Sequence, residues 1–225
     1  MAEMDQKPKS NAATALERLR ALIFDGSLAA GSDHLESELA LRLNMSRTPV
    51  REALLILDAQ GLLDVRPRKG VRILPVSLHD MAEIYDVLTE LESMAARDAA
   101  LKAYSARALA KLSGAIDRMD AALAVPDLEA WAVADDDFHA ELVLLGGNSR
   151  VQSIVAMMSD QVRRARAITL HMRPLPVKSN ADHRGVLDAI ARGDGEAAAS
   201  IHRSHRIAAK QMLIDLLKRH RLTSI

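Results

Sequence analysis

The chain contains no cysteine among its 225 residues. Disulfide bridges and thiolate metal ligands are therefore excluded, and a chain without disulfides is typical of a reducing compartment. Aromatic side chains make up only 2% of the residues, which leaves few platforms on which unpaired bases could stack. The scarcity of stacking residues argues against a protein that binds RNA or single-stranded DNA.

Neither sign of charge is in excess, because 30 Lys and Arg residues balance 30 Asp and Glu residues. Net charge therefore favours no particular partner. No apolar run approaches the roughly 20 residues of a membrane span. The N-terminal segment MAEMDQKPKSNAA also lacks the apolar centre of a signal peptide. The sequence predicts a cytoplasmic protein without a membrane partner.

The first third of the chain combines short helical patterns with two β-prone runs. Residues 1–10 are expected to form a disordered tail. Apolar spacing predicts one helix after this tail, a second at 36–43 and a third at 47–60. The runs LLDVR and VRILPV flank PRKG and predict a β-hairpin.

Beyond Pro75 the pattern changes to amphipathic helical segments, with no competing strand signal. Breaks at YS, VPD, GGN, RPLP and GDG separate them. The expected ranges are 79–103, 105–124, 127–145, 149–172, 179–192 and 195–220. We therefore expect a mainly α chain, with a small first domain at 11–76 and an all-α antiparallel bundle of about six helices at 77–225.

Three short helices and a β-hairpin are typical of a winged helix-turn-helix, whose second motif helix enters the major groove of double-stranded DNA. Residues 42–72 carry seven basic and three acidic side chains, so the neutral chain contains a local basic excess. Arg47 and Arg51 lie four residues apart at the start of the recognition helix, where both can reach a groove. Gly70 at the hairpin tip allows close approach of the backbone to a duplex. A solvated basic face is the alternative interpretation of the charges alone.

The stretch LESELALRLNMSRTPVREALLILDAQGLLDVRPRKGVRI closely resembles the DNA-binding domain of GntR-type bacterial transcription regulators. The resemblance covers about 11–76, and Ser37 stands where family members commonly carry arginine. It implies that Arg47, Thr48 and Arg51 contact operator DNA from the helix. The expected DNA-binding residues are Ser46, Arg47, Thr48, Arg51, Arg68, Lys69 and Gly70.

A second pattern lies in DDDFHAEL, where Asp135 and His139 are one helical turn apart on an apolar stripe. His183 and His205 also lie on apolar stripes of later helices. A lone histidine on such a face is more often a satisfied core residue, but these four groups would each need a separate buried partner. One shared cation would satisfy all of them, and nitrogen and oxygen ligands without cysteine suit Zn²⁺ or Ni²⁺.

Two rival ligands lie close to this set. Asp136 is three residues before His139 but falls off the stripe, and His202 points about one residue's turn away from His205. The other histidines fit no ligand spacing and are expected at the surface or in loops: His34, His79, His171 and His220.

Residues 77–225 resemble the FCD effector domain of the FadR subfamily of GntR regulators, in its shorter, VanR-like variant. The matching motifs are DDDFH, DHRGVLDAIARGDGEAA and IHRSHR. The resemblance implies a divalent metal bound by Asp135, His139, His183 and His205, and a small organic acid as effector. One arginine of QVRRARAITL could pair with a second carboxylate of that effector. The candidates are Arg163, Arg164 and Arg166.

The sequence therefore predicts a homodimeric, ligand-responsive transcription regulator on a two-fold related operator, and not an enzyme. The alternative is a metalloenzyme, because an open metal position could activate water. No general base or nucleophile is evident beside the expected ligands, and an enzyme has no use for a basic wing. A regulator without metal is a third interpretation.

Overall fold

The computed structural model describes residues 10–75 and 77–221, and these divide after residue 75 into two compact units. The expected disordered tail lies outside the described residues, apart from Ser10. The Ser10 hydroxyl accepts a hydrogen bond from the backbone N–H of Ala13 and thereby caps the first helix. Within the described ranges, no helix has the length and apolar character needed to span a bilayer.

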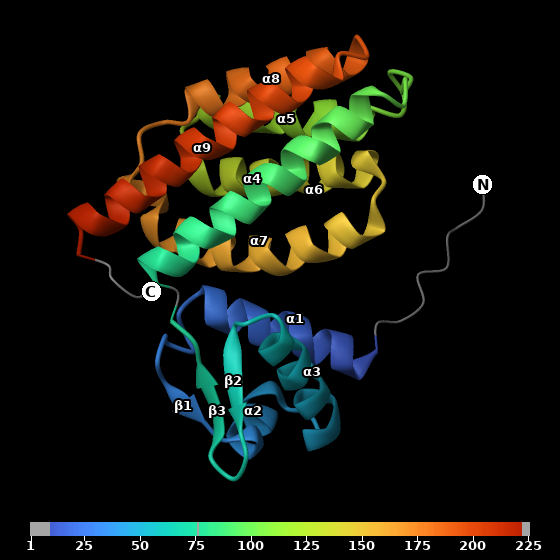
Figure 1. Ribbon diagram of the computed structural model, residues 1–225. Coiled ribbons are helices and arrows are strands. Elements are labelled where there is room, and N and C mark those ends of the chain that lie inside the picture. Colours follow the sequence, from blue (N-terminus) through green and yellow to red (C-terminus); the bar gives the residue numbers. More distant parts are fainter. Residues whose placement is uncertain (1–9, 76, 222–225) are drawn as a thin grey trace. The chain divides into compact units, whose positions relative to one another are not determined.

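The N-terminal unit combines three helices with a small antiparallel sheet in the strand order β1–β3–β2 (Figure 1). The elements are α1 (Asn11–Phe24), β1 (Asp33–His34), α2 (Glu36–Leu43), α3 (Arg47–Ala59), β2 (Leu63–Arg66) and β3 (Gly70–Ile73). The predicted helices and hairpin are confirmed. The short strand β1 was not expected. It exists because Asp33 and His34 pair with Arg72 and Val71 of β3.

The core of this unit is built by the helical and strand periodicities of its elements. Leu19 and Ile23 of α1 are four residues apart and therefore share one face, which meets Leu54 and Leu57 of α3 in the same hydrophobic cluster. Ile73 of β3 closes the cluster from the sheet. Full burial of such a side chain contributes about 1.5–3 kcal/mol. Packing of this kind fixes α3 and leaves its opposite face to solvent.

The second unit is helical, as the sequence predicted. Its elements are α4 (Leu78–Ala100), α5 (Ala110–Ala124), α6 (Leu128–Gly146), α7 (Ser149–Thr169), the 3₁₀ turn η1 (Leu170–Met172), α8 (Val177–Ala191) and α9 (Gly195–Arg219). The last three residues of the expected helix 149–172 form the 3₁₀ turn η1, α8 begins two residues early, and the break between α4 and α5 is wider than expected. α4 ends three residues early and α5 begins five residues late, because the segment between them forms turns such as Leu109 N–H to Ser105 C=O.

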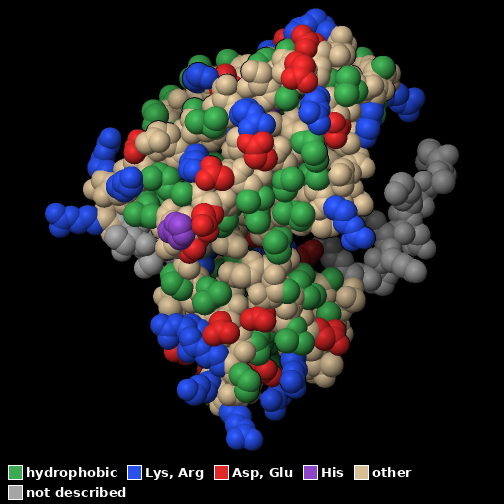
Figure 2. All heavy atoms as spheres, in the orientation of Figure 1, with side chains coloured by type: hydrophobic (Ala, Val, Ile, Leu, Met, Phe, Trp, Pro, Cys, Tyr) green, Lys and Arg blue, Asp and Glu red, His purple; other side chains and the backbone are tan. Residues whose placement is uncertain are grey.

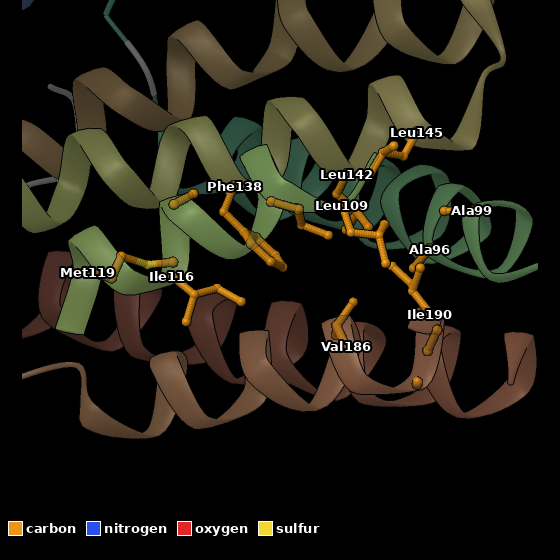
Figure 3. Packing of buried hydrophobic residues seen from close by; sticks show 14 of the residues in the cluster. Ala96, Ala99, Leu109, Ile116, Met119, Phe138, Leu142, Leu145, Val186 and Ile190 are labelled. Carbon is orange, nitrogen blue, oxygen red and sulfur yellow. The ribbon is translucent and has the colours of Figure 1, made fainter. Parts of the chain in front are cut away.

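Helix packing in this unit brings α4 against α9 and α6, and α5 against α6 and α8. Phe138 of α6, Ile116 of α5 and Val186 of α8 are fully buried in one cluster between these helices (Figure 3). Gly146 lets α6 approach α4 closely, since a Cβ there would lie 2.8 Å from Cα of Ala95. The same packing places the polar faces of α6, α8 and α9 opposite one another in the interior.

Candidate metal centre and DNA-binding surface

The first two turns of α3 present a polar face. Ser46 is the N-cap residue of α3, and its hydroxyl makes no capping hydrogen bond. Arg47, Thr48 and Arg51 are exposed, whereas Val50 on the other face is buried in the core. The predicted recognition residues therefore lie together at one exposed helix start, which is the part that enters a major groove in helix-turn-helix proteins.

The basic residues of this unit fall into two groups. Arg66 and Arg72 are held by Asp33 at 3.2 and 3.3 Å, so their charges are matched within the unit. Arg51 forms no ion pair with any residue that the structure describes, and Arg68 at the hairpin tip is exposed. Lys and Arg side chains gather over the part of this unit that contains the β2–β3 hairpin (Figure 2). Arg47 pairs with Glu36 at 4.0 Å, so among the expected DNA-binding residues the charges without an ion-pair partner in the described ranges are those of Arg51, Arg68 and Lys69.

Gly70 has a structural role that the sequence did not reveal. Its φ of +85° lies in the left-handed region, and a Cβ there would lie 2.2 Å from the carbonyl oxygen of His34. The close backbone approach at this glycine is therefore to β1 of the same chain. Arg68 and Lys69 of the connecting turn remain exposed beside it.

Four buried side chains from three helices converge in the second unit. Asp135 and His139 of α6, His183 of α8 and His205 of α9 offer ligand atoms that all lie within 4.8 Å of one another. Nε2 of His183 lies 3.2 Å from Nε2 of His205 and 3.6 Å from Oδ1 of Asp135. Nε2 of His139 lies 3.7 Å from Oδ2 of Asp135. Three imidazole Nε2 atoms and one carboxylate thus face a common point.

The donor set fits a divalent ion. Two ligand atoms bound to one Zn²⁺ at about 2.0–2.1 Å lie at most about 4.2 Å apart. The closest approaches, 3.2 to 3.7 Å, satisfy that limit. Imidazole nitrogens and a carboxylate oxygen brought this close together in a buried site are suited to share one cation.

The electrostatic surroundings favour the protonation states that bind metals. Burial holds the pKa of His139 and His183 well below the usual value, so both imidazoles are neutral at pH 7. Burial opposes ionisation of Asp135, but the Arg166 guanidinium holds the pKa of that carboxyl well below its ordinary value. The ring nitrogens are therefore free to coordinate, and the carboxylate is charged.

A second buried group lies behind His139. Oε2 of Glu92 on α4 lies 2.9 Å from Nδ1 of His139 and 3.3 Å from Nε2 of His202. These three residues are spaced closely enough to hold an ion of their own. Arg206, however, donates a 2.9 Å hydrogen bond to Oε1 of Glu92 and already matches its charge. Glu92 is therefore better suited to orienting His139, so that Nε2 of that ring faces the four-residue site.

The two rival ligands lie outside the four-residue site. Asp136 is bound by Arg163 at 2.8 Å and Arg166 at 3.1 Å. His202 is fully buried and faces Glu92. Among the remaining histidines, His79, His171 and His220 are exposed, as expected. The expectation for His34 was wrong, because that residue is half-buried in β1, with Nε2 2.7 Å from the Ser32 hydroxyl.

A pocket of about 510 Å³, including its open mouth, adjoins the candidate metal centre. Asp135, His139 and His205 contribute to its wall. Of the three arginines proposed for an effector, only Arg166 lines it, and Arg166 is bound to Asp135 at 2.7 Å. Arg163 is exposed and pairs with Asp136 and Asp160, and Arg164 is buried outside the lining.

Several lining residues were not identified from the sequence. Arg206 and Tyr85 approach from α9 and α4, with the Arg206 guanidinium 5.1 Å from the centre of the Tyr85 ring. The Arg166 guanidinium lies over the ring of Trp131 of α6 in the same way, 5.8 Å from the ring centre. Arg173 lies beyond η1 and also lines the pocket. Glu92, behind the four-residue site, was also not identified. A sequence signal for it existed, because Glu92 lies on the apolar stripe of α4, where a buried carboxylate requires a partner.

Comparison with known proteins agrees with both units. Residues 11–73 match the bacterial regulatory proteins of the gntR family, and residues 83–208 match the FCD domain. A helix-turn-helix transcriptional regulator of Streptomyces ambofaciens is 34% identical over 84% of this chain and 78% of its own length. The helix-turn-helix transcriptional repressor RspR of Escherichia coli is 26% identical over 83% of this chain and 82% of its own length.

Among solved structures, E. coli McbR/YncC superimposes with a TM-score of 0.77, covering 92% of this chain and 99% of its own, at 21% identity. At that identity the similarity concerns the fold alone. The family match covers more than half of the chain and rests on both units. The chain belongs to the GntR family of bacterial regulatory proteins, in the FadR-like group with an FCD domain, and is a DNA-binding transcription regulator.

Proposed function

We propose that this regulator binds one divalent metal ion and a small carboxylate effector in its helical unit, and that the effector modulates operator binding. The observation that carries the proposal is the convergence of Asp135 with the Nε2 atoms of His139, His183 and His205 beside a pocket. Zn²⁺ or Ni²⁺ suits these ligands.

The pocket supports an anionic effector. A divalent ion with four protein ligands supplies a Lewis-acidic position to which a carboxylate can bind. The wall of the pocket also contains three arginines, Arg166, Arg173 and Arg206, whose planar guanidinium groups suit carboxylates. Tyr85 and Trp131 provide the apolar surface that excludes water from a bound acid.

The DNA-binding surface that we propose consists of the exposed start of α3 and the wing. Arg47, Thr48 and Arg51 would reach base edges, Ser46 would contact a phosphate, and the tip of the β2–β3 hairpin would follow the backbone. The tip residues are Arg68, Lys69 and Gly70. We further propose a homodimer, since one winged helix supplies a small footprint and a symmetric pair doubles it on a two-fold operator.

The direct test is the metal content of the purified full-length protein, measured by mass spectrometry of the elements. We expect about one zinc or nickel ion per chain in the wild type. The His183→Ala variant should lose the ion and the response of operator binding to its effector. The matched control is His79→Ala, which removes an exposed histidine outside the cluster and should keep both. A wild type without stoichiometric metal that still responds to its effector contradicts the proposal.

A further inference from the structure

We propose that the effector is a small dicarboxylate, with one carboxylate on the metal ion and the other bound by Arg173. This inference rests on the proposed metal and effector site and specifies the class of ligand. The sequence placed the arginine for a second carboxylate in QVRRARAITL, whereas Arg173 lies outside that run, in the RPLP break between two helices.

Arg173 is a cation without a matching anion. Its Nε and Nη2 both donate to the hydroxyl oxygen of Thr169, at 3.3 and 2.9 Å, and that hydroxyl in turn donates to the carbonyl of Ala165. No ion pair joins Arg173 to any carboxylate in the described part of the chain. Its guanidinium is thus held in place by a neutral group while lining the pocket. Such a group is prepared for an incoming anion.

The other two arginines of the pocket are already matched. Arg166 donates to Asp135 at 2.7 Å and to Asp136 at 3.1 Å. Arg206 donates to Glu92 at 2.9 Å. A ligand carboxylate would have to compete with these buried partners, whereas at Arg173 it replaces only a hydroxyl. This difference selects Arg173 rather than its neighbours for the second acidic group.

Two cationic positions in the pocket point to two negative charges on the ligand. Arg166 and Arg206 already face Asp135, Asp136 and Glu92, whereas Arg173 has a hydroxyl as its partner. A divalent ion at the four-residue site would be the second cationic position, and buried charge is unfavourable without counter-charge. A dicarboxylate matches both positions, and a monocarboxylate matches only one.

The test is calorimetric titration of the full-length, zinc-loaded protein with malonate, succinate, glutarate and propionate at constant ionic strength. We expect at least one dicarboxylate to bind about tenfold or more tightly than propionate, since each factor of ten corresponds to about 1.4 kcal/mol. The Arg173→Gln variant should bind that dicarboxylate no better than propionate, with unchanged propionate affinity and zinc content. Arg173→Lys keeps the charge but not the planar fork, and should fall between the two.

The matched control is Arg150→Gln, which removes an exposed arginine in the first turn of α7 and should retain the wild-type preference. Equal affinity for dicarboxylates and propionate overturns the inference and leaves the metal and effector site standing. So does an Arg173→Gln variant that keeps the dicarboxylate preference, or one that loses propionate binding as well. Failure of the zinc-loaded wild type to bind any of the four acids contradicts the proposed effector site itself, and the inference with it.

Discussion

Among the described residues of the N-terminal unit, every buried side chain is hydrophobic. The helical unit also buries polar and charged side chains. The buried polar and charged residues are Thr89, Glu92, Ser93, Asp135, His139, Asp160, Arg164, Arg166, Thr169, Asn180, His183, His202, His205 and Arg206. Polar burial is unfavourable unless each group finds a partner. The interior of the first unit therefore serves stability and leaves function to its surface. In the second unit the interior itself contains the candidate site.

Removing the metal should have the largest effect, and only on the helical unit. An ion bound at a thousandfold excess over its dissociation constant stabilises the folded state by about 4 kcal/mol. For a protein of this size that corresponds to a shift of about 8–16 °C in melting temperature. Calorimetry with and without a chelator measures the shift. Hydrogen exchange should show that α6, α8 and α9 lose protection while α1 and α3 do not.

His183→Ala provides the control for chelation. Without one of the four ligands, the variant should melt at the lower temperature from the outset and show no further shift with chelator. If chelator changes neither the melting temperature nor the hydrogen exchange of the wild type, the interior of the helical unit is stabilised by packing alone, like that of the N-terminal unit.

A cavity in the apolar interior should destabilise the N-terminal unit in turn. Leu54 is 1% exposed, and Leu54→Ala should reduce the free energy of unfolding of this unit by about 3 kcal/mol. Metal content should not change, because the substituted residue lies in the other unit. The matched control is Leu55→Ala, at a neighbouring position that is 51% exposed, with an effect of about 0.5 kcal/mol or less. Chemical denaturation monitored by hydrogen exchange distinguishes the variants, and equal losses would contradict the packing argument.

Acid should destabilise the metal-free helical unit more than the N-terminal unit. Burial keeps the pKa of His139, His183 and His202 well below the usual value. Below about pH 6.5 the histidines of the unfolded chain bind protons, whereas the buried imidazoles of the folded chain do not. The stability of the folded state is therefore greatest above that pH and falls as the pH decreases. Between pH 7 and pH 6 the expected loss is about 2 kcal/mol for the three groups together. Denaturant titrations of the chelated protein at both pH values measure it, and a flat profile would show that these imidazoles are not buried neutral.

The smallest expected effect concerns the surface of the N-terminal unit. Arg51→Ala should lower affinity for the cognate operator relative to random DNA by about 1–2 kcal/mol, because an arginine fork on guanine is worth roughly that discrimination. Arg66→Ala should reduce this discrimination less, since Arg66 is bound to Asp33 and Asp64. Fluorescence anisotropy on both DNAs compares the variants. Equal losses on the two DNAs for Arg51→Ala would limit that residue to phosphate contact.

Most of the fold could be predicted from local periodicity. Helices as long as α6 and α9 repeat the apolar spacing often enough to be recognised. The breaks between the helices, at glycine and proline, were also visible in the sequence. Strand β1 was missed because two residues, Asp33 and His34, cannot show an alternating pattern. It forms through pairing with β3, which is a contact between distant segments.

The candidate site was predictable to the extent that its residues are local. Asp135 and His139 are one turn apart on a single helix, so their shared face follows from helix geometry. Glu92 and Arg206 meet only because α4 packs against α9, and sequence spacing does not contain that information. Arg173 belongs to a connection without periodicity. Groups that depend on helix packing or on a loop therefore required the structure.

The candidate metal ligands belong to α6, α8 and α9, which are separated along the chain by turns and loops. An ion held by all three would close two loops, and loop closure removes conformations mainly from the unfolded chain. It would thus act as a cross-link in a chain that has no cysteine. Unlike a disulfide, such a cross-link would form in a reducing environment and would open when metal is removed. It also requires α9, so a chain whose synthesis stopped before His205 would never acquire it.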